Sequence, residues 1–361
     1  MKRRYLRKLK KLVLQTAYLG GKPLKRTQTH EAELPPQGTA ADVDASFART
    51  YCDKKAVLTI VSDDGDFETG KALDALTKTY GLSVTVAGTV TNIGSHEAWW
   101  KAALRENPLL ELVSHSYNHA CMGETNRIAK SRLRLRHEIA HSKQFFEKHF
   151  GKKQICFVCP ENKMCAIGYE VLQDCGYVAV RRGTRGNNVL YPKAGREPGE
   201  LYNLKSRGIM DHEGDVKTRR EAVQTAIDNR EWLIEMWHNV RKTDDGAYQT
   251  ILLPDAEQHL TYLKERSEAG DLWIATLTDV VKYATELETA ILATKQGDDA
   301  LTIYAGVTTD DPVTYDHALT VCFRAPEGYE IAEGSAAWKK DDGWCVNVPP
   351  NTAVRIPLNK L

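Results

Sequence analysis

The sequence of 361 residues lacks any apolar run of about 18 or more residues, so it contains no ordinary transmembrane helix. It also lacks a strong charge of either sign, because 49 basic and 48 acidic side chains leave a net charge of +1. This balance gives no electrostatic reason to expect a nucleic-acid partner. The composition is that of a globular protein, and the sequence indicates no oligomeric state.

The N-terminal segment has basic charge but no clear secretory pattern. After MKRRYLRKLKK, the apolar stretch is short and is interrupted by Gln15 and Thr16, whereas a signal peptide has an unbroken apolar core. An amphipathic helix lying on a membrane surface is one alternative, and a solvated basic tail is the simplest interpretation. Residues 20–50 are rich in glycine, proline and polar side chains and predict a linker.

The eight cysteines form no complete zinc-binding pattern. Cys156 and Cys159 are a Cys-x-x-Cys pair with Cys165 close behind, but no fourth ligand stands at a suitable spacing. Their neighbours are apolar, so we expect buried, reduced thiols. Reduced thiols favour a cytoplasmic location, and a secreted or cell-surface location is the alternative.

Apolar, β-branched runs alternate with helical patterns from residue 55 to residue 288, which predicts a parallel α/β fold. Strands are expected at 56–61, 83–88, 109–113, 155–158, 177–181, 232–237 and 272–275. Helices are expected at 68–80, 96–105, 126–150, 167–175, 219–229, 253–269 and 278–288. A doubly wound sheet would have a glycine-rich phosphate loop after the first strand. Two aspartates stand there instead, so a (β/α) barrel is predicted.

Beyond residue 290 the pattern changes to short alternating runs separated by turn residues. This pattern predicts a small antiparallel β-sandwich. The expected organisation is therefore a basic N-terminal segment and linker at 1–50, a barrel at 51–289 and a β-sandwich module at 290–361.

Residues that can carry chemistry follow the predicted strands. Asp63 and Asp64 follow the first strand, His115 and His119 follow the third, and His238 ends a late one. Barrel enzymes place their active sites at these strand ends. If residues 115–119 form a helical turn, both imidazoles share a face and can bind a divalent metal. One aspartate would complete a three-ligand site with open positions, and the other would be free to act as a base.

Each motif also has a purely structural interpretation. An aspartate pair after a strand often caps the next helix, and spaced histidines or a histidine at a strand end are often surface residues. The combination of DDG and His-x-x-x-His at successive strand ends favours the metal site, because such a metal activates water and polarises a carbonyl. His238 could then donate a proton to the leaving group.

The set DDG, H-S-x-x-H, a strand followed by proline and a late strand ending in histidine resembles the polysaccharide deacetylase family. This is carbohydrate esterase family 4, the NodB-homology domain, and the resemblance spans residues 53–288. It implies a distorted (β/α) barrel of about seven strands. It also implies that Asp63 is the base, that Asp64, His115 and His119 bind a metal, usually zinc, and that His238 is the acid. Residues 271–283 resemble the end of members that carry a C-terminal β-sandwich.

The third motif of the family departs from its pattern. Arg-x-Pro-Tyr corresponds here to residues 158–161, Val-Cys-Pro-Glu, so the arginine that orients the base is missing. Pro160 and Glu161 are nevertheless expected at the substrate, because the backbone N–H of Glu161 can still bind an oxyanion. The Glu161 carboxylate would favour a cationic substrate if it does not simply point into solvent.

Several further residues are candidates of lesser weight. Arg181, Arg182 or Arg185 could replace the missing arginine, although surface arginines are common. Tyr117 is a candidate for the wall of the cleft, and Trp99-Trp100 is expected to pack against the barrel. The family's aspartate that tunes the acid histidine has no clear match, and Asp211 is the nearest candidate.

The sequence therefore predicts a metal-dependent hydrolase that removes N- or O-linked acetyl groups from an oligo- or polysaccharide. Zn²⁺ is the expected metal, and Co²⁺, Ni²⁺ or Mn²⁺ are alternatives. A hydrolase of non-sugar amides and a catalytically weakened carbohydrate-binding protein are the alternative functions. The altered third motif supports both alternatives, whereas the retention of Asp63 and His238 favours the deacetylase.

Overall fold

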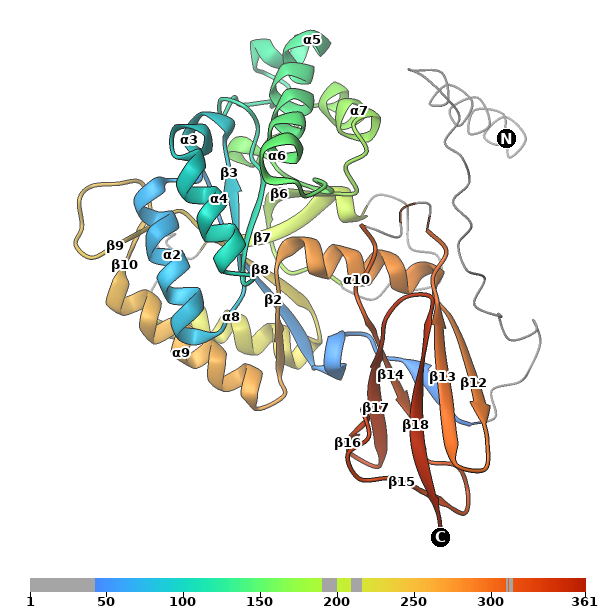
Figure 1. Cartoon of the computed structure of the whole chain (residues 1–361). Coiled ribbons are helices and arrows are strands. Elements are labelled where there is room, and N and C mark those ends of the chain that lie inside the picture. Colours follow the sequence, from blue (N-terminus) through green and yellow to red (C-terminus); the bar gives the residue numbers. More distant parts are fainter. Residues whose placement is uncertain (1–42, 190–199, 209–215, 310, 312–313) are drawn as a thin grey trace, which may run out of the picture. The chain divides into compact units, whose positions relative to one another are not determined.

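The computed structural model describes residues 43–189, 200–208, 216–309, 311 and 314–361 (Figure 1). Its largest sheet is a closed parallel barrel in the order β2-β3-β4-β5-β6-β7-β8, in which β8 pairs with β2. A further parallel strand, β11 (Leu272–Ile274), pairs with the first half of β2. The barrel strands are β2 (Ala56–Ser62), β3 (Val84–Gly88), β4 (Leu110–Ser114), β5 (Cys156–Val158), β6 (Ala179–Arg185), β7 (Leu204–Gly208) and β8 (Trp232–Trp237). The predicted (β/α) barrel is confirmed.

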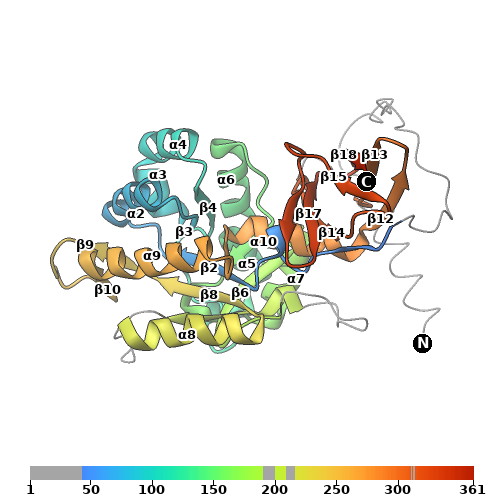
Figure 2. The ribbon, with the colours of Figure 1, turned by 90° about the horizontal axis from the view of Figure 1, so that it is seen from below.

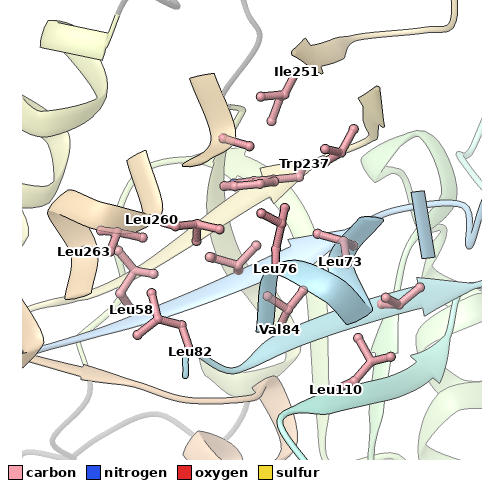
Figure 3. Packing of buried hydrophobic residues seen from close by; sticks show 14 of the residues in the cluster. Leu58, Leu73, Leu76, Leu82, Val84, Leu110, Trp237, Ile251, Leu260 and Leu263 are labelled. Atoms are coloured by element: carbon pink, nitrogen blue, oxygen red, sulfur yellow. The ribbon is translucent and has the colours of Figure 1, made fainter. Parts of the chain in front are cut away.

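Both faces of the barrel wall are covered by apolar side chains. Every residue of β2 is buried. Leu58 packs with helix residues such as Leu76 and Leu260 in one core cluster (Figure 3), whereas Val57 and Val61 belong to a second cluster. This alternation with a period of two residues explains why the strand is a continuous apolar run.

Helices connect the strands and cover the outside of the sheet. Figure 2 shows α2, α8 and α9 around β2 and β8. The helices are α2 (Phe67–Tyr80), α3 (Val90–Ser95), α4 (Glu97–Glu106), α7 (Ala166–Asp174), α8 (Val216–Asn229), α9 (Leu253–Glu268) and α10 (Leu277–Thr289). None of the helices in the described ranges combines the length and the apolar character that crossing a bilayer requires.

The helix predicted at 126–150 differs from the prediction. It begins with the separate turn η3 (Arg127–Lys130) and then runs through α5 (Arg132–Arg136), the π-helical segment η4 (His137–His141) and α6 (Ser142–Phe150). The helix predicted at 96–105 is confirmed as α4, whereas the short helix α3 before it was not predicted. Strand β7 was not predicted, because only one of its five residues, Leu204, is a large apolar residue. The three-residue strands β9 (Asn239–Arg241) and β10 (Thr250–Leu252) were also missed.

The C-terminal part is the predicted antiparallel β-sandwich. It has one sheet in the order β1-β14-β17-β16 and a second in the order β12-β13-β18-β15. Strand β1 (Ala45–Phe47) pairs with β14, so the predicted linker is wrong for these three residues. The other strands are β12 (Ile291–Gln296), β13 (Ala300–Gly306), β14 (Leu319–Phe323), β15 (Tyr329–Ile331), β16 (Trp338–Lys340), β17 (Gly343–Val348) and β18 (Thr352–Lys360).

Candidate active site

The turn after β2 places two carboxylates at the end of the barrel. Asp64 has φ +74° and Gly65 has φ +71°, so the chain reverses sharply. A Cβ atom at Gly65 would lie 2.8 Å from the Cα atom of Gly88, so only glycine fits this approach to β3. The N-cap of α2 is Asp66, whose carboxylate accepts a backbone N–H of the first turn at 2.8 Å. Asp63 and Asp64 are therefore not the capping residues.

The segment from His115 to His119 is a loop after β4 and not the predicted helical turn. Ser116 has φ +74° and His119 has φ +58°, which no α-helix contains. The hydroxyl oxygen of Ser116 accepts a hydrogen bond from the N–H of His119 at 3.0 Å. The two histidines still converge, but the loop geometry brings them together.

A buried carboxylate from η4 holds this loop. Glu138 accepts hydrogen bonds from the backbone N–H groups of Tyr117 at 3.1 Å and Asn118 at 2.9 Å. It also accepts the side-chain amide of Asn118 at 3.1 Å. The sequence analysis missed Glu138, because nothing in the sequence distinguishes it from other helical glutamates.

Asp64, His115 and His119 form a group that could hold a metal ion, with ligand atoms all within 4.8 Å of one another. The Nε2 atoms of His119 and His115 lie 3.1 Å and 3.5 Å from Asp64 Oδ1. His115 donates its Nδ1–H to the carbonyl oxygen of Val158 at 2.9 Å, which directs the lone pair of Nε2 towards Asp64. One carboxylate oxygen and two imidazole nitrogens are a donor set that suits zinc and leaves open positions.

The charges of the metal-free site favour a cation. Burial opposes the ionisation of Asp64, but hydrogen bonds to His115 and His119 outweigh it and hold the pKa of Asp64 well below its usual range. The hydrogen bond to Asp64 raises the pKa of His119 above its usual value. These opposite shifts show that the group attracts positive charge, as a metal site does.

A second group of potential ligands, Asp53, Cys322 and Cys345, fits a metal less well. The ammonium group of Lys340 is paired with the carboxylate of Asp53. The two sulfur atoms are 2.9 Å apart, whereas thiolates on one tetrahedral zinc are separated by roughly 3.8 Å, given a Zn–S bond of about 2.3 Å. Of the two groups, the one at the barrel end is the better candidate.

Asp63 lies beside the metal-ligand group and is paired with a buried arginine. Its Oδ2 atom accepts a hydrogen bond from Nη2 of Arg181 at 2.5 Å, and Arg181 has an exposed fraction of 0%. The other oxygen of Asp63, Oδ1, is buried and has no hydrogen-bond partner within the described residues. Of the three candidate arginines, Arg181 is therefore the one that contacts the predicted base. The guanidinium of Arg182 lies over the ring of Tyr169 instead.

Arg181 stands next to the position at which the resemblance places an arginine. Strands β5 and β6 are parallel neighbours, and Val158 is the register partner of Arg181. Register partners on parallel strands direct their side chains to the same face. The guanidinium of Arg181 therefore reaches Asp63 from β6, the strand next to the one on which the resemblance places an arginine.

His238 follows β8, which pairs with β2 on the side opposite to β3. The hydroxyl of Ser62 donates a hydrogen bond to its carbonyl oxygen at 2.9 Å, which ties the end of β8 to that of β2. Burial lowers the pKa of His238, and the negative charges of Asp63 and Asp64 partly oppose this effect. The backbone N–H of Asp63 also donates a hydrogen bond to the carbonyl oxygen of Trp237 at 2.8 Å, so His238 and Asp63 lie at the same end of the barrel.

The remaining predicted residues are distributed around this centre. Pro160 is buried and begins the turn η5 (Pro160–Asn162), and Glu161 has φ +50°. A hydrogen bond from Cys121 lowers the pKa of Glu161, whose carboxylate also lies 3.4 Å from the ammonium of Lys163.

Three aromatic candidates pack against other side chains. Tyr117 is partly buried against a core cluster, and its ring centroid is 4.6 Å from that of His137. Trp100 is fully buried and Trp99 partly buried, as the packing interpretation predicted. Asp211 lies outside the described residues.

Comparison with known proteins gives one family match. Residues 50–180 match the family model of polysaccharide deacetylase. No curated protein matches the chain. The solved structures that are similar include a putative polysaccharide deacetylase from Mycobacterium smegmatis, with 10% identity and a TM-score of 0.45, covering 67% of this chain and 94% of the other.

Two further solved structures are similar to this chain. A family 4 carbohydrate esterase from Streptomyces lividans, solved in complex with acetate, has 14% identity and a TM-score of 0.40 over 61% of this chain and 91% of its own. A carbohydrate esterase family 4 pseudoenzyme from Bacillus anthracis has 12% identity and a TM-score of 0.42 over 63% of this chain and 66% of its own.

Proposed function

We propose that this chain, which carries a polysaccharide deacetylase domain, removes acetyl groups from a carbohydrate in a metal-dependent reaction. The observation that carries the proposal is the convergence of Asp64, His115 and His119 beside the buried pair of Asp63 and Arg181. In this proposal the resident metal is zinc and the substrate is an oligo- or polysaccharide. A cytoplasmic location is part of the same proposal, because buried cysteines such as Cys156 and Cys159 in apolar surroundings suit a reducing compartment.

A divalent metal held by Asp64, His115 and His119 would supply Lewis acidity towards water and towards the acetyl carbonyl. Asp63 acts as the general base, because its Oδ1 atom is buried beside the ligand group and is free to accept a proton. Arg181 holds the other oxygen of Asp63, which fixes the direction in which Oδ1 points. The base is therefore positioned before the substrate arrives.

His238 donates the proton to the departing sugar amine or alcohol. Burial lowers the pKa of His238, which favours its neutral form, so in this proposal His238 takes up a proton during the reaction and passes it on. Asp63 takes a proton from water in the first step. Transfer of that proton to His238 completes the proton balance. The backbone N–H of Glu161 is the proposed donor to the carbonyl oxygen as it gains negative charge.

Arg181 also supports the deacetylase over a catalytically weakened binding protein. The missing arginine at position 158 was the main reason to doubt catalysis. An arginine with no exposed surface that is hydrogen-bonded to the proposed base supplies the same interaction from the next strand.

The test is acetate release from oligosaccharides that carry N-acetyl or O-acetyl groups, with the zinc-loaded protein. We expect Asp63→Asn to lower kcat by roughly 10²- to 10⁴-fold, since this is the usual contribution of general acid–base catalysis. Asp342→Asn removes a carboxylate that is 80% exposed and should leave kcat unchanged. The proposal is wrong if the wild-type protein releases no acetate from any substrate, or if Asp63→Asn is as active as the wild type.

A further inference from the structure

One aromatic side chain stands apart from all others in the described part of the chain. Tyr248 has an exposed fraction of 66%, and every other described tyrosine, tryptophan or phenylalanine is buried or partly buried. Its ring centroid lies 4.9 Å from that of His238, and the two ring planes are at 89°. The most exposed aromatic ring therefore lies directly against the proposed acid.

The loop that carries Tyr248 is closed at its base. It connects β9 and β10, which pair in parallel so that Asn239 and Thr250 are register partners. The side-chain amide of Asn239 donates a hydrogen bond to the carbonyl oxygen of Tyr248 at 2.7 Å, and Asn239 is 9% exposed. These contacts fix the backbone of Tyr248 next to His238 while its ring faces solvent.

The chemistry of the proposed reaction explains such a ring. The leaving nitrogen or oxygen is attached directly to a sugar ring, and His238 must reach that atom to protonate it. The sugar ring must therefore lie within a few ångströms of His238, which is where the ring of Tyr248 is found. The C–H face of a pyranose is apolar, and an exposed aromatic face can bury it at little conformational cost.

We propose that Tyr248 binds the sugar ring that carries the acetyl group and so directs the enzyme to carbohydrate substrates. The inference rests on the proposed deacetylase function and adds to it the residue that distinguishes a sugar from a smaller acetylated compound. Tyr248 is a binding residue in this account and takes no part in proton transfer. A pyranose that presents an unobstructed C–H face is the preferred substrate class.

Two variants test the inference with two substrates. Tyr248→Ala should lower kcat/KM for an N- or O-acetylated oligosaccharide roughly tenfold, mainly through KM, because it removes one aromatic contact. The same variant should hydrolyse ethyl acetate, which has no ring in its leaving group, at the wild-type rate. Tyr248→Phe keeps the ring and should restore kcat/KM for the oligosaccharide.

A matched control separates the ring from the loop. Asp245→Ala removes the hydrogen bonds of Asp245 with the N–H of Ala247 and with Arg241 but leaves Tyr248 in place. It should change kcat/KM for the oligosaccharide less than Tyr248→Ala does. An equal loss on both substrates would mean that Tyr248 only positions His238, and an unchanged KM would mean that no sugar contacts it; either result overturns the inference.

A binding measurement distinguishes failure of this inference from failure of the proposed function. Calorimetric titration of the metal-free protein with a deacetylated chitooligosaccharide requires no turnover. Roughly tenfold weaker binding to Tyr248→Ala than to the wild type would support the inference even if no acetate were released. Equal affinities would overturn it even if the wild-type protein proved to be a deacetylase.

Discussion

Arg181 is a buried cation whose guanidinium has a single described partner. Nη2 contacts Asp63, whereas Nε and Nη1 have no hydrogen-bond partner within the described residues. Breaking a buried ion pair by removing one partner typically costs about 3–5 kcal/mol of stability, because the other charge is left uncompensated. Burying the Arg181 guanidinium carries a desolvation penalty, and its ion pair with Asp63 offsets part of this penalty. We therefore expect Arg181 to have a role in the site.

We predict that Arg181→Met lowers kcat for acetate release on the order of 10²-fold, since Asp63 loses the group that orients it. The double variant Val158→Arg/Arg181→Val should recover much of this loss, because residues 158 and 181 are register partners on neighbouring strands. Arg182→Met should have little effect on kcat. The measurement is kcat by acetate release, with folding checked by circular dichroism.

Two results would contradict this account of Arg181. The first is a folded Arg181→Met variant with wild-type kcat. The second is a relocated arginine that restores stability but not kcat, which would assign Arg181 a purely structural role.

The sequence singles out Asp64, His115 and His119, which the structure brings together beside Asp63, but not which arginine pairs with Asp63. The DDG and His-x-x-x-His motifs are local, so their residues can be read directly. The choice among Arg181, Arg182 and Arg185 depends on which side chains face inward. The register between β6 and β7 shifts between Arg181 and Arg185, so simple alternation along the strand does not decide it.

The loop from His115 to His119 brings two histidines together as predicted, but in a backbone conformation that was not predicted. A spacing of four residues predicts one face of a helix. The chain instead has positive φ values at Ser116 and His119, and Glu138 accepts two of its backbone N–H groups. Glu138 lies in the π-helical segment η4, which is distant in sequence, so no local pattern predicts this loop.

We predict that Glu138→Ala weakens zinc binding by roughly 10- to 100-fold, as is typical when a residue that supports metal ligands is removed. Two backbone N–H groups of the loop lose their acceptor, which should also lower the free energy of unfolding by about 1 kcal/mol for each hydrogen bond. Glu138→Gln keeps an acceptor oxygen and is the matched control. Zinc affinity is measured by competition with a chelator. A folded Glu138→Ala variant with unchanged zinc affinity would show that Glu138 is not needed to fix the conformation of the loop.

At the scale of the whole molecule, closure of the barrel assembles the site. Strand β2 pairs with β3 on one side and with β8 on the other, so the ends of β2, β4 and β8 lie at one rim. The barrel and the sandwich were predictable because the hydrophobic period changes near residue 290. The pairing of β1 with β14 was not predictable. A strand of three residues is too short to show an alternating hydrophobic pattern, and it lies in a segment rich in glycine and proline.

The proposed metal ligands follow two strands, β2 and β4, that only the folded barrel brings together. A metal that binds the native state and not the unfolded chain stabilises the fold by an amount that grows with its concentration. Zinc at about 100 times its dissociation constant should therefore stabilise the protein by about 2.7 kcal/mol. This stabilisation should be absent from ligand variants.

The central claim is that Asp64, His115 and His119 hold one metal ion, and zinc stoichiometry tests it most directly. Elemental analysis after zinc loading and dialysis should give close to one zinc per wild-type chain and little in Asp64→Asn or His119→Gln. Cys345→Ser, which alters the second group of potential ligands, should keep its zinc. A wild-type chain without zinc, or zinc retained in both ligand variants but lost in Cys345→Ser, would contradict the account.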